Sequence, residues 1–462
     1  MEVKKIMSTI AAISTAYGVG GIGVIRISGE DSLAIADKIF DPYVGEQGNC
    51  IKNLGGYRAK YGKIIQSGEP IDDAVVLVFR APNSYTGEDV VEISCHGGLY
   101  ITKKVLRAVL DAGAIPAGPG EFTKRAFLNG KMDLSQSEAV MDLISAKGER
   151  ANKIAFRMKE GHSSEKISEI KEKITDIMAA LSVWADYPED DIPQVDEKML
   201  KNNISEIISS LDEMIKNYDM FKAVKEGVKV AIVGRPNVGK STLMNCLSGS
   251  QKSIVTDIPG TTRDAIEESI MIGDIPVILV DTAGIRETDD TVEKIGVERA
   301  KNHMKDSEIT FVVLDASSEI SPQDRKILDD IDSKKSIIIL NKCDESKKIN
   351  RADLSTYKAE IVELSALKNT GMDELKNCVE NLVGVSKLDP ADVVISNERQ
   401  LASLKNAENI LKKSLEELEL GITLDAVTVL LQDALEVFME FTGETVSEAV
   451  INKVFSKFCV GK

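Results

Sequence analysis

The stretch Val230-Ala-Ile-Val-Gly234-Arg-Pro-Asn237-Val-Gly239-Lys240-Ser241-Thr242 decides the fold class of this chain. Its first residues are apolar and typical of a buried strand, and the glycines allow backbone N–H groups to point inward at phosphate oxygens. Lys240 can reach the terminal phosphates of a nucleotide, and the Ser241 hydroxyl can ligate magnesium. The stretch therefore predicts a phosphate-binding loop that follows a strand and opens a helix.

The pattern of apolar and polar residues around this loop predicts three kinds of segment. Between 221 and 384, short apolar runs typical of parallel strands alternate with helices; the runs are 228–233, 277–280, 310–314 and 336–340. Residues 121–220 carry apolar side chains at helical spacing, and the same spacing is found again in residues 385–462. Residues 1–120 are typical of short strands and turns with a helix or two. We therefore expect an α/β domain inserted into a helical one, whose two parts pack together.

Three more boxes follow the loop in the order expected of a guanine-nucleotide site. Asp281-Thr282-Ala283-Gly284 ends one strand and can approach magnesium and a γ-phosphate. Asn341-Lys342-Cys343-Asp344 ends another, and its aspartate can accept two hydrogen bonds that guanine offers and adenine does not. Ser365-Ala366 supplies a backbone contact to the guanine oxygen. Together the boxes predict binding of GTP in preference to ATP.

The segment between the first two boxes predicts a switch loop. A threonine within 256–264 can ligate magnesium only when a γ-phosphate is present. In small signalling GTPases a glutamine after the Asp-x-x-Gly box orients the attacking water, but this position is Ile285 here. Another side chain must therefore orient the water, and the acidic run that follows offers four candidates: Glu287, Asp289, Asp290 and Glu293. The residues alone do not choose among them. They also leave open that this acidic run is a solvated helix face.

Composition excludes several classes of protein. With 43% hydrophobic and 28% charged residues the chain is not disordered, and at a net charge of −17 it has no general attraction to nucleic-acid phosphates. Six scattered cysteines and three histidines argue against a zinc site or a disulfide framework. No apolar run reaches the roughly 18–20 residues of a membrane span, so we expect a cytoplasmic protein without a membrane segment. Residues 1–120 are nearly neutral, with 12 basic and 13 acidic residues, which favours them for an anionic small molecule.

The motifs of the chain resemble those of one family, the bacterial and organellar tRNA-modification GTPases called MnmE or TrmE. The resemblance extends from the first strand to the last residue. Its pieces are Gly234–Ser241, Gly260–Asp264, Asp281–Arg286, Gly120-Glu-Phe-Thr-Lys-Arg-Ala-Phe-Leu-Asn129 and the terminal Phe458-Cys-Val-Gly-Lys462. The GTPase boxes are shared with ribosome-assembly GTPases, whereas the Gly-Glu-Phe segment and the Cys-x-Gly-Lys terminus are more specific.

The resemblance implies an α/β and α multi-domain fold. It comprises an N-terminal α+β folate-binding and dimerisation domain (1–120), a discontinuous helical domain (121–220 and 385–462), and an inserted Ras-like P-loop GTPase domain with a mostly parallel sheet (221–384). The residues expected to bind GTP are Asn237, Val238, Gly239, Lys240, Ser241, Thr242, Thr256, Asp257, Ile258, Pro259, Gly260, Thr261, Thr262, Asp281, Thr282, Ala283, Gly284, Asn341, Lys342, Asp344, Ser365 and Ala366.

The resemblance also implies metal-binding and catalytic roles. The resemblance assigns Ser241 and Thr262 as the magnesium ligands. It implies that potassium activates the paired GTPase domains, and it assigns four residues to the potassium ion: Asn237, Thr256, Ile258 and Thr261. A monovalent cation beside the phosphates can neutralise transition-state charge as an arginine finger would. The water-orienting carboxylate carries over to Glu293, with Lys240 and Cys459 as the other candidate catalytic residues.

For a folate such as 5-formyl-tetrahydrofolate, the family positions map to Arg26, Glu92, Lys131 and the terminal Lys462. The cations suit the glutamate tail of the folate, and Glu92 suits the amide and amine edge of the pterin. From the residues alone, Arg26 and Lys131 are equally well read as surface charges. A lone cysteine such as Cys459 is usually just a small apolar side chain, but the resemblance places it near the folate site.

The function implied by the resemblance is a GTPase that acts as a homodimer on tRNA. With a flavin- and NADH-dependent partner of the MnmG (GidA) type, in a heterotetramer, it adds a carboxymethylaminomethyl or aminomethyl group to the wobble uridine of certain tRNAs, using a tetrahydrofolate one-carbon donor. One alternative is a non-modifying GTP switch in ribosome assembly. It is disfavoured because the residues outside 221–384 are acidic (34 basic against 46 acidic residues) where a basic RNA-binding module is expected. The other alternative is a folate-binding module regulated by GTP.

A second glycine-rich stretch, Gly18-x-Gly20-x-x-Gly23, matches the dinucleotide-binding fingerprint in spacing. That fingerprint opens a helix, whereas residues 24–27 are a strand candidate. We therefore predict a flexible turn at this stretch.

Overall fold

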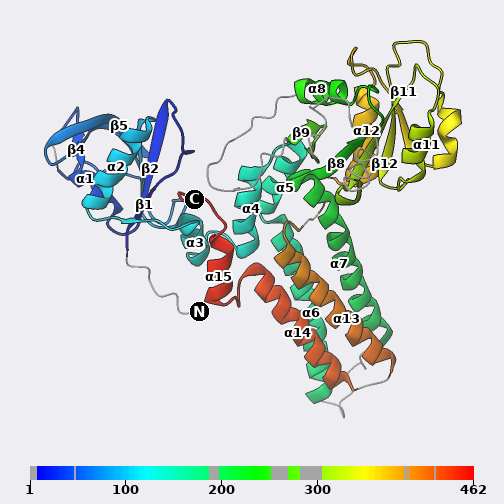
Figure 1. Ribbon diagram of the computed structural model, residues 1–462. Helices are drawn as coiled ribbons and strands as arrows, with labels where there is room; N and C mark the ends of the chain where they lie inside the picture. Colours follow the sequence, from blue (N-terminus) through cyan, green and yellow to red (C-terminus); the bar gives the residue numbers. More distant parts are fainter. Residues whose placement is uncertain are drawn as a thin grey trace. The chain divides into compact units, whose positions relative to one another are not determined.

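The computed structural model describes residues 8–45, 48–186, 197–250, 269–280, 304–389, 392, 395–420 and 423–462. By their internal contacts these residues form two compact units (Figure 1). The first contains residues 8–141 and 439–462, and the second contains the described residues from 142 to 438. The first unit therefore joins the two ends of the chain.

The first unit is built on a seven-stranded sheet with the order β3-β4-β5-β6-β2-β1-β7. Its strands are β1 (Ile10–Ile13), β2 (Ile22–Ser28), β3 (Phe40–Pro42), β4 (Arg58–Gln66), β5 (Glu69–Phe79), β6 (Val90–His96) and β7 (Ile115–Pro116). Neighbouring strands are antiparallel except β1 and β7, which are parallel. The short strands expected of residues 1–120 are confirmed, and the strand candidate at residues 24–27 lies within β2.

Helices cover this sheet and join it to the C-terminal segment. The apolar faces of α1 (Ser32–Lys38) and α2 (Leu99–Asp111) form one core with the sheet. Gly113 follows the end of α2, and its φ of +126° is not compatible with continuation of the helix. Next to the sheet, α3 (Glu121–Leu128) packs on α15 (Glu448–Phe455) through Phe127 and Phe455, whose ring centroids are 6.2 Å apart.

The second unit contains a six-stranded sheet with the order β13-β12-β11-β8-β10-β9. Its strands are β8 (Val228–Val233), β9 (Ser269–Ile272), β10 (Ile275–Leu279), β11 (Ile309–Asp315), β12 (Ser336–Asn341) and β13 (Glu360–Glu363). Among the described strands of this sheet, only the β9–β10 pair is antiparallel. The predicted, mostly parallel α/β sheet is therefore confirmed, and its central strands are apolar because both faces are covered.

The helices and 3₁₀ turns belonging to this α/β part lie between or after its strands. They are α8 (Lys240–Ser250), α11 (Pro322–Asp329), η1 (Arg351–Tyr357), α12 (Met372–Val383) and η2 (Val385–Lys387). At the start of α11, Ser321 and Asp324 form a reciprocal capping box, which satisfies N–H groups that a helix leaves unpaired. This cap fixes the loop that leaves β11.

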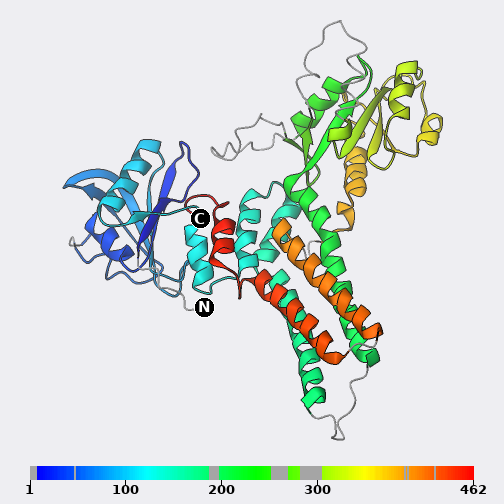
Figure 2. The same cartoon turned by 60° about the horizontal axis from the view of Figure 1, so that its bottom comes forward.

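Long helices make up the rest of the second unit. They are α5 (Glu149–Lys159), α6 (His162–Asp186), α7 (Glu197–Glu226), α13 (Glu398–Glu419) and most of α14 (Leu424–Thr442). Helices α7 and α13 lie side by side in both views (Figures 1 and 2) and are in contact. The predicted packing of the 121–220 segment on the C-terminal segment is therefore confirmed, through α7 and α13 in this unit and through α3 and α15 in the first.

The boundary between the two units differs from the composition change at residue 121. It falls inside α4 (Leu134–Ser145) and again inside α14, because α3 and the start of α4 pack with the C-terminal residues around Phe455. Helix α7 also continues almost directly into β8 and contacts β10, so the helices and the α/β sheet share one unit. None of the helices in the described part of the chain is long and apolar enough to cross a bilayer.

Candidate functional site

The phosphate-binding loop lies between β8 and α8, in the strand–loop–helix context that the sequence predicts. Three residues of the loop have a positive φ: Gly234 at +152°, Asn237 at +65° and Gly239 at +97°. A Cβ at Gly239 would collide with the side chain of Asn341. Glycine is therefore needed at this position both for its conformation and for the close approach of the neighbouring loop.

Lys240 and Ser241 stand at the start of α8. The Lys240 ammonium donates to the carbonyls of Gly234 and Arg235, at 2.8 Å each, and burial lowers the pKa of this lysine. It is thus held across the loop, where phosphate oxygens can replace a carbonyl as its partner. Ser241 and Thr242 are exposed in the first turn of the helix, whose N-terminus favours anions.

Asn341 connects the phosphate-binding loop to the two base-recognition boxes. Its side chain is buried at the end of β12, where Nδ2 donates to the Val238 carbonyl at 2.9 Å. Its Oδ1 accepts from the N–H of Ala366 at 3.0 Å. A single amide thus uses both of its ends to bring together three of the predicted boxes.

Asp344 presents an exposed carboxylate in the same region. A hydrogen bond from the buried Ser365 hydroxyl lowers the pKa of Asp344, which keeps the carboxylate ionised as an acceptor for guanine donors. The Ser365 backbone exchanges two hydrogen bonds with Thr370, at 3.1 and 3.2 Å, so the loop that carries it is closed on itself. The arrangement fits the predicted recognition of guanine.

Two residues that the sequence reasoning missed support these loops. Asp315, the last residue of β11, pairs with the ammonium of Lys342 at 2.7 Å. Burial opposes ionisation of Asp315, but hydrogen bonds from Lys342 and Ser317 outweigh it and lower its pKa. Asp324 pairs with Arg235 of the phosphate-binding loop at 3.3 Å. Asp315 could have been predicted from its position, because it ends a strand of the sheet as Asn341 does.

The remaining predicted nucleotide and metal residues lie outside the described residues, so the structure gives no position for them. They are Thr256, Asp257, Ile258, Pro259, Gly260, Thr261, Thr262, Asp281, Thr282, Ala283, Gly284 and Glu293.

In the first unit, the predicted folate residues Arg26 and Glu92 face each other on adjacent strands. They are register partners on β2 and β6, and the Arg26 Nε and Nη2 atoms each lie 2.8 Å from Glu92 Oε1. The Arg26 guanidinium carbon also lies 5.4 Å from the ring centroid of Tyr85 and 5.6 Å from that of Phe122. Arg26 is thus held by a carboxylate and two aromatic rings, which is not the environment of a solvated surface charge.

The C-terminal residues reach the same place. Val460 forms a β-bridge with Pro119, and the Ser14 hydroxyl donates to the Gly461 carbonyl at 3.1 Å. The pKa of Lys462 is lowered, first by burial and then by the charge of Arg26, while Glu92 and Cys459 oppose the shift. The structure therefore brings Arg26, Glu92, Cys459 and Lys462 together.

Lys131 takes part through a neighbouring loop. Its ammonium donates to the carbonyl of Pro82 at 3.1 Å, and its stem lies near Gly87. Both contacts belong to residues 80–89, the loop that also carries Tyr85. The loop therefore touches two of the four predicted folate residues.

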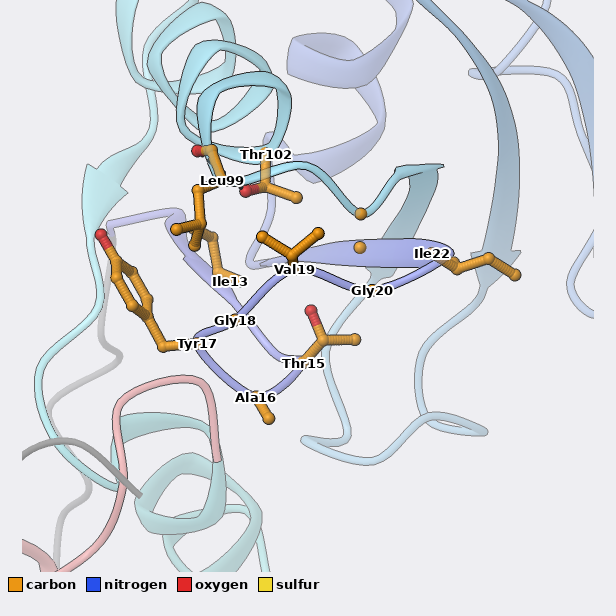
Figure 3. A pocket seen from close by; sticks show the side chains of 12 residues that line it. Ile13, Thr15, Ala16, Tyr17, Gly18, Val19, Gly20, Ile22, Leu99 and Thr102 are labelled. Carbon is orange, nitrogen blue, oxygen red and sulfur yellow. Dashed lines mark hydrogen bonds between the residues drawn. The ribbon is translucent and has the colours of Figure 1, made fainter. Parts of the chain in front are cut away.

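The glycine-rich stretch near Gly20 lines a cavity of about 230 Å³ beside the start of α2 (Figure 3). Tyr17, Val19 and Leu99 contribute to its wall. Two backbone hydrogen bonds, from Gly20 N–H to Gly97 and from Gly97 N–H to Gly21, tie the stretch to the loop before α2. The chain continues from the stretch into β2, so its context is not that of a dinucleotide fingerprint, as predicted.

The geometry around Asp344 generates a prediction about base selection. Replacing Asp344 by Asn should weaken GTP binding about 100-fold, or about 2.7 kcal/mol, because an amide cannot accept from both guanine donors. Titration of a fluorescent GTP analogue measures this. The matched control is Asp373→Asn in the exposed first turn of α12, which should leave the affinity unchanged. Equal affinities for both variants would contradict the assignment of Asp344.

Comparisons with known proteins agree with the layout of the chain. A family model described as the GTP-binding protein TrmE N-terminus matches residues 9–131, and one described as the MnmE helical domain matches residues 134–459. A protein of Thermoanaerobacter pseudethanolicus named tRNA modification GTPase MnmE is 43% identical, over 99% of this chain and 100% of that protein. One of the same name from Clostridioides difficile is 42% identical, over 98% and 99%.

Among solved structures, the G domain of the T. maritima FeoB iron transporter is similar to part of this chain. It is 28% identical, with a TM-score of 0.25, over 34% of this chain and 98% of that one. The family models together match residues 9–131 and 134–459, and the relative from Thermoanaerobacter pseudethanolicus aligns with 99% of this chain. The chain therefore belongs to the MnmE (TrmE) family.

Proposed function

We propose that this chain is a tRNA modification GTPase activated by potassium. The observation that carries the proposal is its similarity, over 99% of its length, to a protein named tRNA modification GTPase MnmE. With a flavin-dependent partner it would add a carboxymethylaminomethyl or aminomethyl group to the wobble uridine of certain tRNAs. GTP hydrolysis would drive the opening and closing of paired GTPase domains and not the carbon chemistry itself.

The described part of the nucleotide site supports binding of GTP with magnesium. Lys240 would neutralise the terminal phosphates, and the Asn341 and Ser365 loops would receive the base beside Asp344. The exposed Ser241 hydroxyl in the first turn of α8 fits a magnesium ligand, with Thr262 as the second. Glu293 would orient the attacking water.

Potassium is proposed beside the phosphates, held by Asn237, Thr256, Ile258 and Thr261. Asn237 is exposed, and it lies in a loop whose backbone is curled at a φ of +65°. Its carboxamide oxygen is a hard ligand of the kind that an alkali ion takes. The ion would supply positive charge where the transition state develops negative charge.

The cluster of Arg26, Glu92 and Lys462 supports a folate site. Burial and, after it, the charge of Arg26 lower the pKa of Lys462, so two cationic side chains act on the same place beside Glu92. The anionic glutamate tail of 5-formyl-tetrahydrofolate would pair with these cations, with Lys131 at the adjoining loop and Glu92 toward the pterin. Cys459 lies beside the cluster, where it is the candidate group for chemistry on the one-carbon unit.

The proposed assembly is a homodimer that joins a flavin- and NADH-dependent partner of the MnmG (GidA) type in a heterotetramer. A net charge of −17 supports a partner that makes much of the contact with tRNA, since an acidic protein gains little from phosphate contacts. The proposed compartment is the cytoplasm.

The modification itself is tested by mass analysis of wobble nucleosides from cells that lack this protein. The expected outcome is loss of the carboxymethylaminomethyl or aminomethyl uridine, with restoration by the intact gene. Unchanged nucleosides accompanied by defective ribosomal subunits would contradict the proposal and favour an assembly switch.

Activation by potassium is tested by the rate of GTP hydrolysis at equal concentrations of potassium and sodium. We expect a rate at least about tenfold higher in potassium, since supplying charge to a phosphoryl-transfer transition state in this way lowers the barrier. Asn237→Ala should reduce the difference between the two salts. Equal rates for the unaltered chain would refute the cation mechanism.

The role of Glu293 is tested by replacing it with Ala. Hydrolysis should fall by about 10²–10⁴-fold, the usual contribution of a group that positions or deprotonates the nucleophile, while GTP affinity should stay unchanged. Single Ala variants of Glu287, Asp289 and Asp290 are the matched controls from the same acidic run. If one of these loses turnover and the Glu293 variant keeps it, the assignment is wrong.

A further inference from the structure

Arg125 is a charged side chain with no exposure to solvent, in the first unit on α3. Its Nη1 donates to Glu88 at 3.1 Å and to the carbonyl of Ser8 at 2.9 Å, and its Nη2 donates to Glu121 at 3.0 Å. Burying a guanidinium is costly unless carboxylates and hydrogen bonds compensate for the loss of water. The contacts therefore fix the positions of the three partners relative to α3.

The more consequential partner is Glu88, because it belongs to the loop of residues 80–89. Besides Arg125, Glu88 accepts from the Ser28 hydroxyl of β2 at 2.7 Å. Ser28 in turn lies 2.7 Å from the Thr86 hydroxyl of the same loop, and both of these side chains are buried. The loop is thus tied to both α3 and β2 through one buried network.

The same loop and the same helix supply the two rings that hold Arg26. Tyr85 comes from the loop, and its hydroxyl lies 2.8 Å from that of Thr123 on α3. Phe122 comes from α3. Both rings lie within 5.6 Å of the Arg26 guanidinium carbon. The orientation of Arg26 therefore depends on how the loop and the helix are held together.

We propose that Arg125 is a positioning residue for the folate site. It clamps the 80–89 loop to α3, and through Tyr85 and Phe122 it fixes the guanidinium of Arg26 for the carboxylates of the ligand. The inference rests on the proposed folate binding. Arg125 itself is out of reach of a ligand, because its side chain is fully buried. A planar fork is required, since a lysine ammonium is a point charge that cannot bridge two carboxylates in the same geometry.

The test measures the affinity of the full chain for 5-formyl-tetrahydrofolate by calorimetry. Arg125→Lys keeps the buried charge but loses the fork, and we expect the dissociation constant to rise about tenfold or more. GTP affinity, set by loops in the other unit, should not change. The matched control is Arg107→Lys on α2, where the arginine is exposed and forms an ordinary helix-surface pair with Asp111.

A double-mutant cycle separates positioning from a merely structural role. Tyr85→Ala removes the contact of the 80–89 loop with Arg26 and leaves that of Phe122, so Arg125→Lys should cost less affinity in that background than it does alone. Purely additive effects, or an unchanged folate affinity in Arg125→Lys, would overturn the inference. Where Arg125→Lys fails to fold, as judged by lost GTP binding, Glu88→Gln removes the same clamp with less buried charge and carries the same expectations. Absence of folate binding by the unaltered chain would instead overturn the proposed folate site, and the inference with it.

Discussion

Two hydrogen bonds of the buried Asn341 side chain hold together three loops that lie far apart in the sequence. The constraint behind them is general: a polar group removed from water must find its partners inside the protein. Because one amide supplies both a donor and an acceptor, Val238 of the phosphate-binding loop and Ala366 of a base loop are fixed at a common point. The phosphate and base ends of the nucleotide site are thereby built as one structure.

The same constraint joins helical segments of the second unit to one another. Asp142 of α4 is buried and pairs with the Lys225 ammonium of α7 at 2.6 Å. The same ammonium donates to the carbonyl of Ser396, just before α13, at 3.0 Å. Three helical segments thus meet at the point where α7 gives way to β8. This is a physical reason for the helices and the α/β sheet to behave as one compact unit although their sequence textures differ.

Much of this fold and part of its chemistry could be predicted from the sequence, for reasons that are local. The strands of the α/β sheet are apolar runs, and the loop around Gly239 needs glycine where its backbone turns. The supporting pairs could not be predicted in the same way. Arg125 and Glu88 are 37 residues apart, and Asp315 and Lys342 are 27 apart, so no pattern of local spacing links them. Lys462 and Arg26 lie near opposite ends of the sequence. Their proximity was predicted only from the resemblance to the family and not from any local pattern of residues.

The division into units shows a further limit of local patterns. Composition changes near residue 121, yet α3 remains with the N-terminal sheet, because its side chains serve that sheet: Arg125 and Phe122 face the loop and strand that hold Arg26. Composition records which secondary structure a segment forms, whereas the boundary of a unit depends on where the buried side chains find partners. For α3 those partners are the 80–89 loop and the C-terminal residues.

The net charge of the chain differs from the charges found locally at the C-terminal cluster. The chain as a whole is strongly acidic, and an average field of that sign repels anions. At the C-terminal cluster, two cationic side chains, Arg26 and Lys462, lie beside Glu92, and burial strengthens each interaction within it. A small anion responds to the nearest desolvated charges, whereas a long polyanion such as tRNA samples the whole surface. The local charges of the cluster therefore decide what a small ligand meets there, and the net charge of the chain does not.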